Sequence, residues 1–174
     1  KKRDVEKMVR YEVECNEEVG EIEYRGVNSA AILRGYTPMI QIELESLMGE
    51  ASKSIGMIGK DAAKKALGGW GVRIARIIDK KRVIEEIMKQ IPERGWGVGK
   101  LVKFDEKKNA LIIRIKNCYN AMNYKKSEKP VCYTLAAVIE GAAEIIFGKP
   151  MKCVETKCIA KGDSFCEFKV EPTT

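Results

Sequence analysis

The chain has 174 residues, 45% of them hydrophobic, which is enough for one good core, so a single domain over residues 1–174 is expected. Its net charge of +7 comes from 32 basic residues interleaved with 25 acidic ones, and no helix-turn-helix, zinc-finger or aromatic-basic pattern accompanies it, which disfavours nucleic-acid binding. The chain has no histidine, which excludes Ser-His-Asp and Cys-His catalysis and histidine-ligated metals.

The first half of the chain predicts a hairpin followed by helices. Residues 11–15 and 21–25 alternate apolar and polar side chains, as paired strands do. Thr37 and Pro38 suit the start of a long helix whose apolar stripe continues to Ile58. Three glycines interrupt that stripe and favour either close helix packing or room beside a cavity: Gly49, Gly56 and Gly59. From Val72, isoleucines recur at helical spacing and stop at Pro92, which predicts a second helix.

The second half predicts strands on either side of a helix, giving an α+β order. Residues 96–104 and 110–118 read as strands joined by a polar turn. A helix that starts near Pro130 and ends at Gly148 is interrupted by acidic residues and is too short for the roughly 20 apolar residues of a membrane span. Residues 151–160 and 165–171 then form a closing hairpin.

The six cysteines point to a metal site. The N-terminus shows no apolar secretory segment, so we expect a cytoplasmic protein with reduced thiols, in which metal binding is favoured over disulfides. Cys132, Glu155, Cys158 and Cys166 supply three thiolates and one carboxylate, a set that suits tetrahedral Zn²⁺. Soft sulfur ligands disfavour calcium and magnesium.

Strand alternation makes this metal site a geometric test. Cys166, Phe168 and Val170 share one strand face, which their apolar character marks as buried. In the preceding strand strict alternation separates Glu155 from Cys158, so a bulge or turn near Thr156 is required. Cys153 shares the strand face of Glu155 and is the alternative fourth ligand. Cys15 and Cys118 are expected to be inert buried residues.

The segment from Glu155 to Cys166, with Cys132 on the preceding helix, resembles the C-terminal signature of the 4-vinyl reductase domain. The resemblance is strongest over residues 96–170. It implies a twisted antiparallel sheet packed against helices, the NO-signalling/Golgi-transport-type ligand-binding domain shared by phenol-sensing regulators and TRAPP-type trafficking subunits. It also implies a structural zinc, a homodimer and a hydrophobic cavity. The phenol sensors grip the phenol with a Trp and a His; here no His exists and Leu111 stands at the Trp position.

Three functions remain open. The favoured one is a zinc-stabilised sensor domain that binds a hydrophobic small molecule or lipid. A reductase acting on a vinyl-bearing tetrapyrrole-like substrate is the first alternative, although no nicotinamide or flavin motif is present and no catalytic residue is assigned. A structural or partner-binding subunit is the second. Helical apolar residues in excess of one sheet face, including the stripe from Ile74 to Ile91, favour a homodimer.

Methionines and glycines at helical positions indicate adaptable walls around an apolar cavity. We expect it between the glycine-containing helix and the strands of residues 96–115, with a volume above about 300 Å³. Its predicted lining is Met48, Ile55, Met57, Trp70, Ile87, Trp96, Leu111, Ile113 and Tyr119. Tyr119 or an indole N–H could supply one hydrogen bond to the occupant.

Overall fold

The computed structural model describes residues 13–16, 21–24, 27–29, 36–75, 79–124 and 126–173. The chain divides into two compact units, residues 1–33 and residues 34–174. The expectation of one domain over the whole chain therefore stays a prediction.

The first unit contains a three-stranded antiparallel sheet. Its strands are β1 (Val13–Asn16), β2 (Glu21–Tyr24) and β3 (Val27–Ser29), paired in the order β1-β2-β3. The predicted hairpin is confirmed, because Val13 pairs with Tyr24 and Asn16 with Glu21. Strand β3 was not predicted, since three residues are too few to show an alternating pattern.

The second unit contains a four-stranded antiparallel sheet with the order β4-β5-β7-β6. The strands are β4 (Val98–Asp105), β5 (Ala110–Lys116), β6 (Met151–Lys157) and β7 (Cys166–Pro172). The inward face of the two central strands is apolar, and Ile113 lies opposite Phe168 at its centre with 1% and 0% of their surfaces exposed. The predicted alternation in both strands is confirmed.

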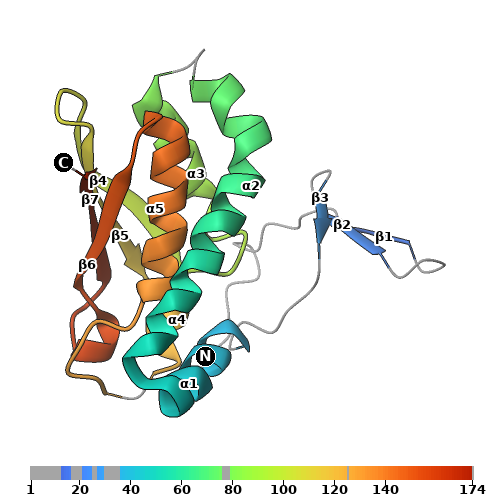
Figure 1. Ribbon diagram of the computed structural model, residues 1–174. Coiled ribbons are helices and arrows are strands. Elements are labelled where there is room, and N and C mark those ends of the chain that lie inside the picture. Colours follow the sequence, from blue (N-terminus) through green and yellow to red (C-terminus); the bar gives the residue numbers. More distant parts are fainter. Residues whose placement is uncertain are drawn as a thin grey trace, which may run out of the picture. The chain divides into compact units, whose positions relative to one another are not determined.

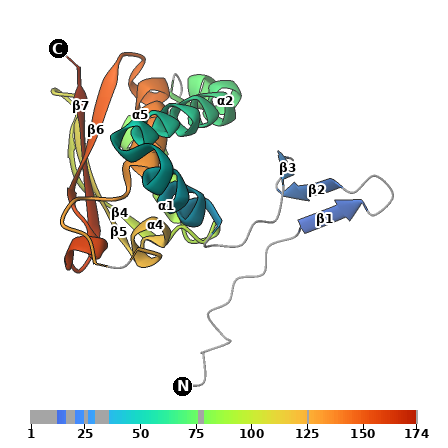
Figure 2. The same ribbon diagram turned by 60° about the horizontal axis from the view of Figure 1, so that its bottom comes forward.

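Helices cover one face of this sheet (Figures 1 and 2). They are α1 (Tyr36–Met48), the 3₁₀ helix η2 (Gly49–Ile55), α2 (Gly56–Ala75), α3 (Lys80–Gln90), α4 (Tyr119–Met122) and α5 (Tyr133–Phe147), with a short 3₁₀ turn, η3 (Ile159–Lys161), between β6 and β7. Helix α5 packs on β6, α3 packs on β4, and α2 lies along α5. The α+β architecture with an antiparallel sheet packed against helices is confirmed.

The helix boundaries differ from the predicted ones. The single long helix from Thr37 breaks at Gly49, whose φ of +56° ends α1 and starts η2. The second helix does not start at Val72, because α2 continues to Ala75 and α3 begins only at Lys80. There the Asp79 side chain accepts a hydrogen bond of 2.9 Å from the Lys81 backbone N–H and caps the helix.

Glycines bring α2 and α5 close together. A Cβ atom on Gly56 would lie 3.2 Å from the Ala137 Cβ, and one on Gly141 would lie 2.4 Å from the Lys60 carbonyl oxygen. Of the two uses expected for Gly56, close helix packing is therefore the one observed. Among the described residues, no helix has the length and apolarity needed to cross a membrane.

Candidate functional site

The structure brings the four predicted metal ligands together. Cys132 is the N-cap residue of α5, Glu155 lies in β6, Cys158 follows β6, and Cys166 opens β7. One ligand atom from each lies within 4.8 Å of the other three, and all four residues are buried. The cluster therefore joins the start of α5 to the closing hairpin.

A bulge makes this convergence possible. The pairing of β6 with β7 shifts register between Glu155 and Lys157, where the sequence required an irregularity. The shift places the side chains of both Glu155 and Cys158 on the buried side. After Cys158 the chain turns through η3 and Gly162, whose φ is +104°, and the Asp163 carboxylate accepts a 2.9 Å hydrogen bond from the Cys158 N–H.

The Glu155 carboxylate has the environment of a cation ligand. Its Oε2 accepts a 2.8 Å hydrogen bond from the Cys132 backbone N–H. Its Oε1 is buried and has no hydrogen-bond partner among the described residues. Burial raises the pKa of Glu155 to about 8, so the buried anion is unfavourable as it stands. A bound cation would satisfy Oε1 and favour the ionised carboxylate.

The sulfur atoms have a spacing that suits tetrahedral zinc. With Zn–S bonds of about 2.3 Å, the sulfurs of a tetrahedral site are separated by about 3.75 Å. The Sγ atoms of Cys132 and Cys166 are 3.7 Å apart. The Ile159 backbone N–H lies 3.5 Å from the Cys166 Sγ and supports negative charge there.

The thiols of the cluster are strongly coupled. Hydrogen bonds from Cys132 and Cys166 lower the pKa of Cys158. The hydrogen bond with Cys118, followed by those with Cys158 and Cys166, raises the pKa of Cys132. A thiolate at one position therefore holds protons on its neighbours, and a divalent cation would release them.

Two other cysteines lie near the cluster. Cys153 shares the buried side of β6 with Glu155, but its backbone N–H donates a 2.9 Å hydrogen bond to Glu140 and its thiol is outside the four-residue group. Burial raises the pKa of this thiol. The geometry thus favours Glu155 over Cys153 as the fourth ligand.

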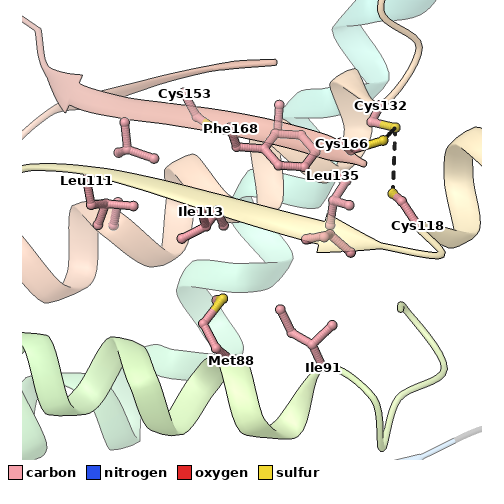
Figure 3. Close-up of a cluster of buried hydrophobic side chains, with 14 of the residues drawn as sticks. Met88, Ile91, Leu111, Ile113, Cys118, Cys132, Leu135, Cys153, Cys166 and Phe168 are labelled. Carbon is pink, nitrogen blue, oxygen red and sulfur yellow. Dashed lines mark hydrogen bonds between the residues drawn. The ribbon is translucent and has the colours of Figure 1, made fainter. Parts of the chain in front are cut away.

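Cys118, in contrast, lies at the edge of the cluster. Its Sγ is 3.7 Å from the Cys132 Sγ (Figure 3), although the sequence indicated only an inert buried residue. The pairing of Ile115 with Cys166 brings the end of β5, and so Cys118, to this place. Strand order is the signal that would have found it, and periodicity along the sequence does not contain strand order. For Cys15, in β1, no side chain is described.

An apolar cavity of about 170 Å³ lies between α3, the sheet and α5. Four of the predicted lining residues surround it: Ile87, Trp96, Leu111 and Ile113. The helices contribute others that sequence reasoning missed, including Ala63, Leu135, Ile139 and Ala143, because periodicity marks a buried stripe without showing which part of it borders a void. Gln90 and Arg94 are its polar lining residues. The volume is below the expected 300 Å³.

The other predicted lining residues lie elsewhere. Met48 and Met57 are exposed, by 51% and 68%, because the long helix that was to carry them inward breaks at Gly49. Met57 borders a separate charged hollow beside α5, of about 520 Å³. Ile55, in η2, and Tyr119 do not line the apolar cavity, although Tyr119 stacks on Trp96 with ring centroids 6.1 Å apart. Trp70 lies in α2, and its side chain is outside the described residues.

Comparison with known proteins supports the resemblance seen in the sequence. Residues 111–172 match the family model of the 4-vinyl reductase domain. An uncharacterised protein of Methanocaldococcus jannaschii is 29% identical over 114 residues, which are 66% of this chain and 61% of the relative. A second one is 35% identical over 101 residues, 58% of this chain and 52% of the relative. The chain therefore spans only about half to three fifths of the length of these relatives.

Solved structures show the same fold. The phenol-responsive sensory domain of the transcription activator PoxR, solved with phenol, has a TM-score of 0.78 at 13% identity, covering 92% of this chain and 84% of that one. A vinyl-4-reductase family protein from Methanocaldococcus jannaschii has a TM-score of 0.55 at 20% identity, covering 84% and 85%. An H-NOX protein from S. oneidensis has a TM-score of 0.52 at 10% identity, covering 85% and 80%. The predicted family resemblance and fold class are confirmed.

Proposed function

We propose that the chain is a zinc-stabilised sensor domain that binds a small hydrophobic molecule. The observation that carries this proposal is the apolar cavity enclosed between α3, the sheet and α5. Well-packed interiors leave few voids larger than a water molecule, so an apolar void of this size calls for an occupant. Its site matches the usual form of a small-molecule pocket, apolar with a few polar groups.

The cavity volume restricts the ligand. An engineered apolar cavity of about 150 Å³ binds benzene, and the cavity here measures about 170 Å³. A molecule with one aromatic ring therefore fits without rearrangement, whereas an acyl chain would require the walls to move. The phenol found in the PoxR domain, which shares this fold, supports a ligand of that size. Here the phenol-binding His is missing, so recognition depends mainly on shape and apolar area.

The proposed zinc is structural. Cys132, Cys158, Cys166 and Glu155 would hold it and fill a tetrahedral coordination shell. The orphaned Glu155 oxygen and the 3.7 Å sulfur spacing both suit Zn²⁺. Bound there, the metal ties α5 to β6 and β7 and supplies folding free energy. Because thiolate ligands must stay reduced, we also propose a reducing compartment such as the cytoplasm.

We further propose that the chain forms a homodimer, on a different surface from the one first expected. In the predicted stripe, Ile84 and Ile91 are buried in the core and cannot form an outer surface. Instead, α1 and the start of α2 expose apolar side chains: Met39, Ile40, Leu47, Met48, Met57 and Ile58. A second copy covering them would remove this apolar surface from water.

Native mass spectrometry and thermal denaturation test these proposals together. Purified, reduced protein should contain one zinc per chain and appear as a dimer. Phenol or indole should raise its melting temperature, whereas a charged compound of similar size, such as benzoate, should do so less because its carboxylate must be desolvated. Equal melting temperatures with and without every aromatic compound would contradict the sensor proposal, and zinc-free folded protein would contradict the structural metal.

A further inference from the structure

The candidate zinc centre contains more donors than a tetrahedral ion needs. Besides the four residues already described, Cys118 is completely buried and places its Sγ 3.7 Å from the Cys132 Sγ. The same distance separates Cys132 from Cys166, and both match the sulfur separation of about 3.75 Å in a tetrahedral zinc site. Cys118 therefore has the spacing of a ligand to one of its neighbours.

The surroundings of Cys118 also suit a metal-bound thiolate. Its sulfur interacts with Cys166 as well as with Cys132, and the backbone N–H groups of Asn120 and Ala121 donate to it. Hydrogen bonds from backbone N–H groups stabilise negative charge on sulfur. An inert apolar cysteine needs no such donors.

Cys118 is nevertheless excluded from the group whose ligand atoms all lie within 4.8 Å of one another. It approaches the cluster from the end of β5, whereas Glu155 approaches from β6. Five donors thus compete for four positions, and Cys118 and Glu155 are the two that arrive from opposite edges of the sheet order β4-β5-β7-β6.

We propose that Cys118 is an alternative fourth ligand that replaces Glu155, so that the zinc centre has a three-sulfur, one-oxygen form and a four-sulfur form. The inference rests on the zinc centre of the proposed function. In the exchange a Zn–S bond to Cys118 forms and the Zn–O bond to Glu155 breaks. The proton lost by the Cys118 thiol is taken up by the Glu155 carboxylate, so the charge of the centre with its two exchanging residues does not change.

The segment that carries Cys118 also contacts the apolar cavity. The next residue, Tyr119, donates its backbone N–H to the Trp96 carbonyl at 3.2 Å, and the two rings stack. Trp96 lines the cavity. An occupant that displaces the Trp96 ring therefore moves Tyr119, and with it Cys118. Ligand exchange at zinc would then report that the cavity is filled.

The test uses the full chain with zinc bound and compares Cys118→Ser, Glu155→Gln, the double variant, and Cys153→Ser. The last removes a buried thiol that lies outside the cluster and is the matched control. Zinc content is measured after a challenge with a chelator, and X-ray absorption counts sulfur ligands at about 2.3 Å against oxygen ligands at about 2.0–2.2 Å.

Glu155→Gln should keep one zinc with four sulfur ligands. Cys118→Ser should keep one zinc with three sulfurs and one oxygen, and Cys153→Ser should match the unmodified chain. Only the double variant should lose zinc to the chelator. Phenol should change the sulfur-to-oxygen ratio of the unmodified chain and leave that of Cys118→Ser unchanged.

The inference is overturned if zinc is present but Glu155→Gln loses it as readily as the double variant does, or retains it with only three sulfur ligands. In that case the zinc centre of the proposed function still stands. If the unmodified, reduced and folded chain holds no zinc, both proposals fall together. The two failures are therefore distinguishable by the metal content of the unmodified chain.

Discussion

Filling the apolar cavity with a larger side chain should stabilise the protein and block its ligand. Ala63, in α2, is buried and lines the cavity, so Ala63→Leu directs three additional carbons into it. The neighbouring Ala62 is exposed on the same helix. Ala62→Leu therefore makes the same chemical change with the same helix propensity, but adds its carbons to solvent.

The size of the effect follows from the void. At about 24 cal/mol per Å³, a cavity of about 170 Å³ costs about 4 kcal/mol, which is the most that any filling could regain. Three buried carbons contribute about 2.4 kcal/mol at about 0.8 kcal/mol each. Imperfect fit removes part of this gain. We expect a net gain of about 1–2 kcal/mol for Ala63→Leu and a change within about 0.5 kcal/mol for Ala62→Leu.

Thermal and urea denaturation provide the assay. A gain of 1–2 kcal/mol corresponds to a rise in melting temperature of about 2–8 °C for a chain of this size. In the presence of phenol or indole, the unmodified chain and Ala62→Leu should show a further rise, whereas Ala63→Leu should show little or none. If Ala63→Leu is less stable than Ala62→Leu, or if both respond equally to the aromatic compound, the cavity is not the ligand site.

Three further predictions concern the metal, an ion pair and the dimer. Cys158→Ser should abolish zinc retention and lower the free energy of unfolding, by about 4 kcal/mol at a zinc concentration 1,000 times Kd, as metal analysis and denaturation would show. Burial acts to raise the pKa of Glu140 and Glu144, but hydrogen bonds from Lys60 hold both below the usual 4.5, so this stabilisation is present above pH 4.5 and is lost as the pH falls through the lowered values. Lys60→Met should therefore cost about 1–2 kcal/mol at pH 7, with a cost that shrinks below pH 4.5 in urea titrations; a cost that does not depend on pH would contradict the ion-pair account. Leu47→Glu should shift sedimentation from dimer to monomer, and an unchanged dimer would place the interface elsewhere.

The sequence was sufficient for features that follow from local rules. Alternation along β6 separated Glu155 from Cys158 and so required an irregularity, which the structure places between Glu155 and Lys157. The turn after Cys158 needed a residue that tolerates positive φ, and Gly162 has a φ of +104°. Each prediction depended only on residues within a few positions of one another.

Features that depend on tertiary packing could not be obtained in this way. Gly49 fits within a helical stripe, and its positive φ arises only because the chain must turn between α1 and α2. Cys118 looked like an isolated apolar residue, because its nearness to Cys132 depends on β5 pairing with β7. Exposure of Met48 and Met57 follows from the break at Gly49, which moved two predicted cavity residues to the surface.

The zinc centre and the cavity share a wall, and this gives the domain a rigid side and an adaptable side. Leu135 lies one turn after Cys132, and Ile115 pairs with Cys166, yet both also line the cavity. A bound zinc would therefore fix this end of the cavity. The opposite wall is α3, which packs on β4, and there the missing side chain of Gly99 lets Met88 approach closely. Because methionine is flexible and α3 is joined to the sheet only by side-chain packing, we infer that ligands larger than the present cavity are accommodated by displacement of α3.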